Sequence, residues 1–158
     1  MKPKFVAAYM DTAWRFAQLS SAQRLKVGAV IVKDNRIISI GYNGTPSGWD
    51  NVCEQLVPEV IDPDSRTITP AQLVTKPEVL HAEMNALMKL ARSTESGEGA
   101  TLFVTHSPCV DCSKSIYQAG ISTVYVAQPY RCSKGIEFLH ACGVEVHELN
   151  HENPYASA

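Results

Sequence analysis

Apolar residues recur every three or four positions near the start of the chain: Phe5, Tyr9, Ala13 and Phe16. This spacing predicts an amphipathic helix that ends near Leu19. Two apolar, β-branched runs follow, at 27–33 and 37–42. Because Asp34 and Asn35 between them favour a tight turn, the two runs are predicted to form an antiparallel hairpin.

The second half of the chain alternates between helical and strand patterns. His81 begins one predicted helix, and two more are predicted over 108–119 and 133–142. Strands are predicted over 101–105, 124–127 and 144–147. A hairpin followed by alternating helices and strands predicts an α/β fold, with a five-stranded mixed sheet and helices on both faces.

Residues 44–79 interrupt this pattern. The segment holds five of the nine prolines and shows little periodicity, so we expect an ordered insertion that lies on the surface near a site. We assign residues 1–150 to a single domain, since a chain of 158 residues can bury one hydrophobic core. Residues 151–158 are expected to form a polar C-terminal tail, with fraying from about Glu148.

Composition narrows the classes of function. The net charge of −2 argues against a polynucleotide partner, because non-specific affinity for nucleic acid comes from neutralised phosphates. No run of about 18 apolar residues is present, as a membrane span would require. Asp11 and Arg15 interrupt the apolar residues near the start, unlike a signal peptide. We therefore expect a cytoplasmic protein with no membrane partner.

Two short motifs carry candidate chemistry: His81-Ala82-Glu83 and Pro108-Cys109-Val110-Asp111-Cys112. Each lies at a predicted helix N-terminus, where free N–H groups and a partial positive charge favour thiolates. Cys109 and Cys112 share one helix face, and with His81 they offer three ligands that suit zinc. Three protein ligands leave a fourth position open, as in catalytic zinc sites. Glu83 is then free to act as a general acid–base.

Each motif alone has a simpler interpretation. A lone Cys-x-x-Cys is often a redox pair or half of a structural zinc site, and a lone His-x-Glu is often a solvated helix start. A zinc-bound pair is not free for thiol exchange, which disfavours an oxidoreductase. A non-catalytic zinc scaffold would need neither Glu83 nor an open zinc position. Together, the motifs match the H-x-E…P-C-x-x-C signature of zinc-dependent nucleobase deaminases.

From about Phe5 to Glu148 the chain resembles the zinc-dependent cytidine deaminase superfamily, and within it the deoxycytidylate (dCMP) deaminases. The narrower likeness rests on Cys53 and on four segments: VGAVIV at 27–32, GYNGTP at 41–46, HAEMNA at 81–86 and FVTHSPC at 103–109. The resemblance implies a three-layer α/β/α sandwich of the cytidine deaminase type. It also implies hydrolytic deamination of dCMP to dUMP and ammonia, which supplies dUMP for dTMP synthesis.

The resemblance implies roles for individual site residues. Glu83 moves protons to N3 of cytosine and to the departing amino group. The backbone of Ala82 and Ser107 binds the Watson–Crick edge of the base, and Asn43 holds the sugar hydroxyl. An Asn before Gly is also a common turn residue, so Asn43 has a purely structural alternative.

A 5′-phosphate needs cationic partners. Arg24 and Lys26 lie before the first predicted strand, and Arg131 follows the fourth. Arginine suits phosphate well. Tyr130 is a candidate for stacking on the base or sugar. The alternatives are solvated surface charges for the cations and ordinary partial burial for the tyrosine.

Metal content and regulation also follow from the resemblance. Some phage relatives carry a second, structural zinc that uses the loop cysteine. The positions near Cys53 do not complete such a site unless Glu78 or an unseen partner contributes, so we expect one zinc per chain. The relatives are commonly homohexamers that dCTP activates and dTTP inhibits, with Mg²⁺ on the triphosphate. Candidate effector contacts are Gly44, Thr45, Lys26 and Arg92. A plain turn and a capping arginine are the alternatives.

The odd number of five cysteines disfavours a disulfide framework. Cys132 and Cys142 have no evident partner and are expected to pack as small apolar residues. For the substrate, dCTP or another cytosine nucleotide is the main alternative to dCMP, because both present phosphate to the same loops. A free nucleoside, guanine or a tRNA adenosine would use the same chemistry, although the small net charge disfavours tRNA.

Overall fold

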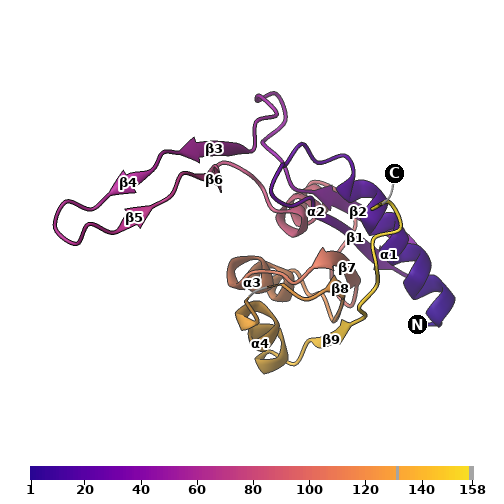
Figure 1. The fold of residues 1–158 in the computed structure, drawn as a ribbon. Helices are drawn as coiled ribbons and strands as arrows, with labels where there is room; N and C mark the ends of the chain where they lie inside the picture. Colours follow the sequence, from indigo (N-terminus) through magenta and orange to yellow (C-terminus); the bar gives the residue numbers. More distant parts are fainter. Residues whose placement is uncertain (131, 157–158) are drawn as a thin grey trace.

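The computed structural model describes residues 1–130 and 132–156. Its central strands are β1 (Gly28–Lys33), β2 (Arg36–Tyr42), β7 (Thr101–His106), β8 (Thr123–Gln128) and β9 (Glu145–Glu148). They form one sheet in the order β2-β1-β7-β8-β9 (Figure 1). β1 pairs antiparallel with both neighbours, whereas β7, β8 and β9 are parallel. The predicted five-stranded mixed sheet is confirmed.

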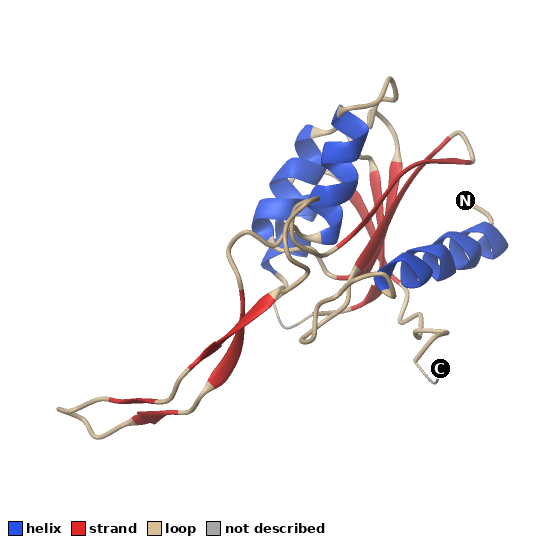
Figure 2. Cartoon of the chain, turned by 90° about the horizontal axis from the view of Figure 1, so that it is seen from above, coloured by secondary structure: helices blue, strands red, loops and turns tan. Residues whose placement is uncertain are grey.

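Helices cover both faces of this sheet (Figure 2). They are α1 (Pro3–Ala17), α2 (Ala82–Ala91), α3 (Val110–Gln118) and α4 (Lys134–Ala141). α1 packs on one face, and the other three helices pack on the opposite face. The expected three-layer α/β/α arrangement is therefore confirmed. The first helix ends at Ala17 rather than near Leu19, and its buried residues are Met10, Ala13, Trp14 and Ala17.

The sheet has one cluster of buried apolar residues on each face, and the alternation of side chains along its strands explains why. Along β1, Ala29 and Ile31 pack toward α2, whereas Val30 and Val32 pack toward α1. Successive side chains of a strand point to opposite faces, so a strand buried on both faces reads as a continuous apolar run. Only Gly28 fits where β1 meets α1, because a β-carbon there would stand 2.0 Å from the Ala13 carbonyl oxygen.

The β1–β2 hairpin forms at the predicted place. Asp34 and Asn35 have φ values of 49° and 58°, a left-handed conformation that Asp and Asn tolerate better than most residues. A two-residue hairpin turn whose twist matches that of the strands requires a positive φ at both of its central residues. The hairpin prediction is confirmed.

The insertion at 44–79 reaches the site as expected, but it contains strands that the sequence pattern did not predict. Part of it forms a two-stranded arm that projects from the body (Figure 1). β3 (Glu54–Val57) pairs with β6 (Gln72–Thr75), and β4 (Val60–Ile61) pairs with β5 (Ile68–Thr69). Proline cannot donate to a strand ladder. Pro58 and Pro70 thus interrupt the ribbon between its two halves without ending it, which hid the strands in the sequence pattern.

The C-terminal segment also differs from the prediction. Leu149 and Tyr155 pack against the α1 side of the core. His151 Nε2 lies 2.7 Å from Asp11 Oδ1, which ties the segment to α1. The expectation of fraying is wrong for residues 149–156, because this segment covers part of the sheet that α1 leaves open. Within the described ranges, no helix has the length and apolar character needed to cross a membrane.

The topology gathers several loops at one edge of the sheet. β7 and β8 end there, and the antiparallel neighbours bring the start of β1 and the end of β2 to the same edge. Ligands in α/β sheets bind beyond the carboxyl ends of the parallel strands. The loops that follow β7 and β8 are therefore placed to build a site.

Candidate active site

Two helix N-termini meet at this edge and bring three candidate ligands together. His81 precedes α2 and Cys109 precedes α3, while Cys112 lies in the first turn of α3. His81 Nδ1 is 3.6 Å from Cys109 Sγ and 3.5 Å from Cys112 Sγ. The three ligand atoms all lie within 4.8 Å of one another. One imidazole nitrogen and two sulfurs at this separation suit a single zinc ion.

The protonation of these groups is linked through their contacts. Hydrogen bonds from the Cys112 thiol and the His81 ring lower the pKa of Cys109 to about 4. The Cys109 thiolate in turn raises the pKa of Cys112 and of His81. The Cys112 backbone N–H also lies 3.5 Å from Cys109 Sγ. A cation bound here would favour deprotonation of both thiols, because metal ligands must lose their protons.

Glu83 is a buried carboxyl beside this cluster. Glu83 as a whole residue is 4% exposed, although it lies in the first turn of α2. Burial raises the pKa of the Glu83 carboxyl above its ordinary value. A carboxyl whose pKa is moved toward neutrality can both accept and release a proton at physiological pH.

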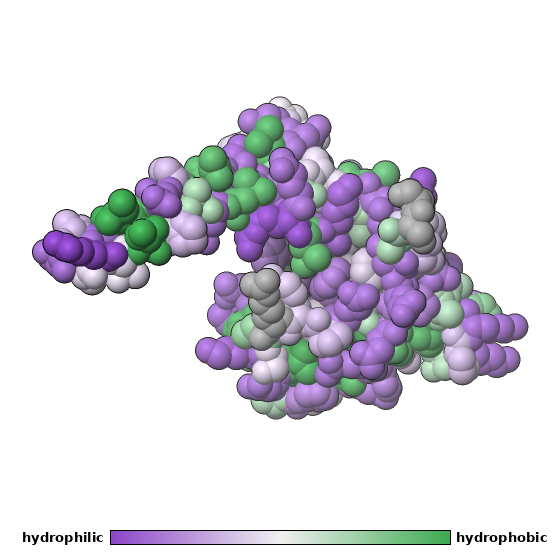
Figure 3. All heavy atoms as spheres, in the orientation of Figure 1, coloured by the Kyte–Doolittle hydropathy of each residue, from purple (hydrophilic) through white to green (hydrophobic). Residues whose placement is uncertain are grey.

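A pocket of about 680 Å³ opens over the cluster and reaches the root of the arm. The space-filling view shows the molecule hollowed below the arm (Figure 3). This volume lies in the range of small-molecule sites. Of the predicted substrate contacts, five line it: Arg24, Asn43, Ala82, Ser107 and Tyr130. Arg131 lies outside the described residues.

Asn43 lines the pocket, but its amide is already bonded. Its Oδ1 accepts the Val27 N–H at 2.8 Å, and its Nδ2 donates to the Leu25 carbonyl at 2.8 Å. These bonds fix the loop before β1, which is a structural role, although Asn43 does not lie in the turn that the sequence offered as its alternative. One amide N–H and one lone pair remain for a ligand.

Backbone groups differ in their availability. Ala82 is the first residue of α2, so its N–H has no partner within the helix. The Ser107 N–H instead donates to the Gln128 carbonyl at 3.2 Å, whereas no backbone N–H of residues 1–130 or 132–156 donates to the Ser107 carbonyl. The Ser107 hydroxyl accepts the Tyr130 N–H at 3.1 Å and thereby holds the loop that carries the tyrosine.

The candidate effector contacts do not share this pocket. Gly44, Thr45, Lys26 and Arg92 are all outside its lining. The Gly44 N–H donates to the Leu80 carbonyl at 3.1 Å, so it is not free for a triphosphate as the sequence suggested. Arg92 lies at the end of α2, roughly 15 Å along the helix from His81. Gly44, which pairs with Leu80, and Arg92 therefore lie at opposite ends of that helix within one chain.

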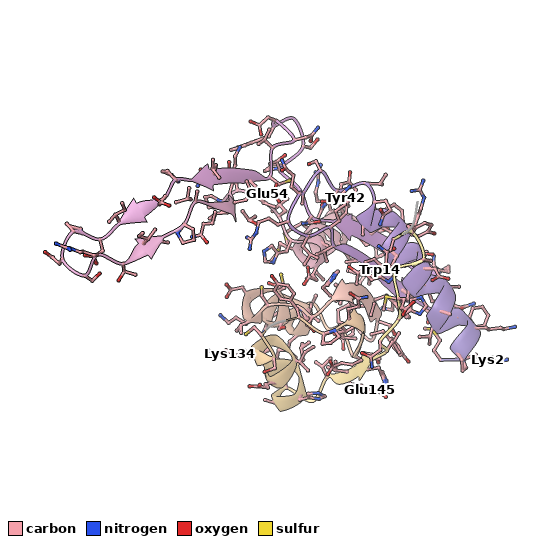
Figure 4. All side chains as sticks on the ribbon, viewed as in Figure 1. Lys2, Trp14, Tyr42, Glu54, Lys134 and Glu145 are labelled. Carbon is pink, nitrogen blue, oxygen red and sulfur yellow. The ribbon has the colours of Figure 1, made fainter. Side chains whose placement is uncertain are left out.

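Glu54 and Thr75 line the pocket from the root of the arm, and no sequence motif singled them out. Glu54 is 5% exposed and marks the place where β3 leaves the body (Figure 4). The only available signal was an acidic residue directly after the loop cysteine. Its significance depends on the pairing of β3 with β6, which the segment's proline content concealed.

The other cysteines are all free thiols. Cys53 is buried and its Sγ lies 3.3 Å from the Ser21 hydroxyl. Cys142 packs against the core as expected, but Cys132 is exposed and lines the pocket, so its predicted packing is wrong. Over residues 1–130 and 132–156, only His81, Cys109 and Cys112 form a group of three or more possible metal ligands.

Comparison with known proteins supports this site. Residues 3–128 match the family described as "Cytidine and deoxycytidylate deaminase zinc-binding region". ComE operon protein 2 of Bacillus subtilis is 37% identical over 142 residues, covering 89% of this chain and 69% of that protein. The deoxycytidylate deaminase of enterobacteria phage T4 is 33% identical over 181 residues, covering 91% and 93% of the two chains.

A solved structure of a dCMP deaminase is also similar to this chain. The crystal structure of the dCMP deaminase from cyanophage S-TIM5, in complex with dCMP and dUMP, is 48% identical with a TM-score of 0.80. The match covers 94% of this chain and 98% of that one. The resemblance drawn from the sequence motifs is confirmed.

Proposed function

Since the chain belongs to the cytidine and deoxycytidylate deaminase family, we propose that it deaminates dCMP, releasing dUMP and ammonia. The observation that carries this proposal is the buried Glu83 beside the His81, Cys109 and Cys112 cluster, within one nucleotide-sized pocket. The product would serve as the dUMP supply for dTMP synthesis.

The donor set fits a zinc ion held by His81, Cys109 and Cys112. Zinc bound there supplies Lewis acidity, which makes water a nucleophile at neutral pH. The protein contributes the proton transfers. Glu83 accepts the two protons of the attacking water in turn and delivers one to N3 and the other to the amino group, so that C4 gains oxygen and ammonia leaves.

The free backbone groups match the edge of cytosine. Cytosine presents an N4 amino donor, and the Ser107 carbonyl is an acceptor in the pocket wall with no backbone donor among the described residues. The Ala82 N–H is a free donor for a ring or carbonyl acceptor of the base. These two contacts would hold C4 over the cluster and beside Glu83.

The remaining pocket residues suit the sugar and phosphate. Arg24 would bind the 5′-phosphate, together with Arg131, and Tyr130 would stack on the base or sugar. Asn43 would reach the sugar hydroxyl with its remaining N–H or lone pair. The alternative substrate is dCTP or another cytosine nucleotide, because a longer phosphate chain meets the same loops.

The direct test is release of ammonia and uracil product from dCMP, dCTP, deoxycytidine and CMP at matched concentration. We expect dCMP to be the best substrate. Deoxycytidine should be poorer in kcat/KM by several tens-fold, since it lacks the charge-assisted phosphate contact. Equal efficiency on the nucleoside would contradict the dCMP assignment, and preference for dCTP would favour the alternative.

We also propose that the chain assembles as a homohexamer. Four large apolar side chains of the arm are each more than half exposed: Leu56, Val60, Ile61 and Ile68. They appear as green patches along the arm in Figure 3. An isolated two-stranded ribbon is marginally stable in water, and a second copy of the chain would cover these side chains.

Regulation by dCTP as activator and dTTP as inhibitor, with Mg²⁺ on the triphosphate, is proposed from the resemblance. Thr45, Lys26 and Arg92 remain candidate contacts. Thr45 and Lys26 flank the hydrogen bond between Asn43 and Val27 in one chain, whereas Arg92 lies at the far end of α2 and would join them from another subunit. The test is a dCMP saturation curve alone and with each triphosphate and Mg²⁺. A sigmoidal curve that dCTP makes hyperbolic and dTTP shifts to higher dCMP would support regulation. Three identical hyperbolic curves would exclude it.

A further inference from the structure

The root of the arm is bonded directly to the loop that carries Arg24. Glu54 Oε1 accepts the backbone N–H of Gln23 at 3.0 Å and that of Arg24 at 3.1 Å. Thr75 Oγ1 accepts the Arg24 guanidinium Nη1 at 3.3 Å. One arm residue therefore fixes the backbone of Arg24, and another holds its side chain.

These two arm residues lie next to each other on adjacent strands. Glu54 and Thr75 are direct partners in the β3–β6 ladder. Residues directly opposite in a ladder have neighbouring side chains on one face. Both also line the pocket, together with Arg24 itself.

The buried carboxylate of Glu54 lowers the stability of the folded chain. Glu54 as a whole residue is 5% exposed, and its Oε2 has no hydrogen-bond partner among the described residues. A buried, half-satisfied carboxylate destabilises a folded chain, and such groups are retained where they serve a function. Glu54 is also distant in sequence from Arg24, so the contact exists only because the root of the arm packs against this loop.

We propose that Glu54 and Thr75 are positioning residues that hold Arg24 in the orientation that binds the 5′-phosphate of the substrate. This inference rests on the proposed function. The root of the arm thereby sets the selectivity for a nucleotide over a nucleoside, although neither arm residue contacts the reacting atoms. A misplaced binding group can cost up to ~10²-fold in rate, so the effect on phosphate binding is measurable.

The test measures kcat and KM for dCMP and deoxycytidine in Glu54→Ala, Glu54→Gln and Thr75→Val. For Glu54→Ala we expect kcat/KM on dCMP to fall about tenfold, mainly through KM, with deoxycytidine unchanged. Glu54→Gln should stay within about threefold of wild type, because its amide oxygen can accept the same two N–H groups. Thr75→Val should show a smaller loss in the same direction.

Two controls separate positioning from general damage. Gln55→Ala alters the next residue of β3, which is exposed and does not line the pocket, and should leave both substrates unaffected. Arg24→Ala combined with Glu54→Ala should lose no more than Arg24→Ala alone, since both act through one contact. Binding of dUMP and deoxyuridine by calorimetry gives the same comparison where turnover of the nucleoside is too slow.

Equal losses on dCMP and deoxycytidine, or fully multiplicative effects of Arg24→Ala and Glu54→Ala, would overturn the proposal. If Glu54→Ala does not fold, Thr75→Val alone decides by the same substrate comparison. Failure of the proposed function is distinguishable, because the wild-type chain would then not deaminate dCMP or would not prefer it to deoxycytidine.

Discussion

Gly41 in β2 lies so close to α2 that a β-carbon on it would stand 2.1 Å from the Ala82 carbonyl oxygen and 2.6 Å from the Ala86 nitrogen. This contact seats the helix that begins with the His81 motif against the sheet. Asn85 adds a second tie, because its Nδ2 donates to the Tyr42 carbonyl at 2.9 Å. The glycine thus sets the depth at which the candidate site is built.

Gly41→Ala is expected to lower the free energy of unfolding by about 1–3 kcal/mol, the usual cost of overpacking. Zinc content should fall with it, because α2 must move away from α3. Thermal unfolding and metal analysis measure the two effects. Gly44→Ala is the matched control, since a β-carbon on Gly44 meets nothing within 4 Å. Equal stability of the two variants would contradict the packing argument.

Cys109→Ala is expected to remove zinc. Metal analysis of the wild-type chain should give about one equivalent, since one group of three ligands is present in the described residues. Cys142→Ala, which alters a free thiol outside the pocket, should keep its metal. Removal of zinc by a chelator should also lower thermal stability, because a bound ligand stabilises the folded state. Unchanged metal content in Cys109→Ala would show that zinc is not bound by His81, Cys109 and Cys112.

Glu83→Gln is expected to keep zinc and lose at least ~10²-fold in kcat, because the amide cannot transfer the protons. The isosteric change leaves the buried volume filled. Glu78→Gln serves as the control, since Glu78 precedes the motif but does not line the pocket, and should retain full activity. Full activity in Glu83→Gln would point to a non-catalytic scaffold or to a different proton carrier.

His106 should make the protein less stable in acid. Burial lowers the pKa of His106 below its ordinary value, so the unfolded chain binds a proton more readily. Stability is therefore lost as pH falls through the unfolded-state pKa of about 6.5, and the loss stops below the folded-state pKa. His106→Gln should reduce the drop in Tm between about pH 7.5 and about pH 5. The exposed His140, changed to Gln, is the control, and an identical drop in both variants would refute the assignment.

The sequence determined the ligand set and most of the sheet. His81, Cys109 and Cys112 were identifiable because ligand chemistry depends on residue type and on short spacing, and helix starts are local features. β1, β7 and β8 were identifiable because strands buried on both faces read as continuous apolar runs. Local turn chemistry at Asp34 and Asn35 fixed the hairpin.

The tertiary structure decided what depends on contacts distant in sequence. The arm was missed because its short strands pair across an intervening turn, and their prolines resemble those of an irregular loop. The docking of residues 149–156 on α1 depends on a side-chain contact to Asp11, which no local pattern encodes.

The sequence also could not show which polar groups are bonded within the fold and which remain available to a ligand. Asn43 is bonded to the loop before β1, and Gly44 is paired with Leu80, so the same residue types carry structural bonds where ligand contacts were expected. Glu54 reaches the Arg24 backbone only through the fold of the arm. Residue types define which chemistry is available, whereas the long-range packing of loops determines which groups are left free to perform it.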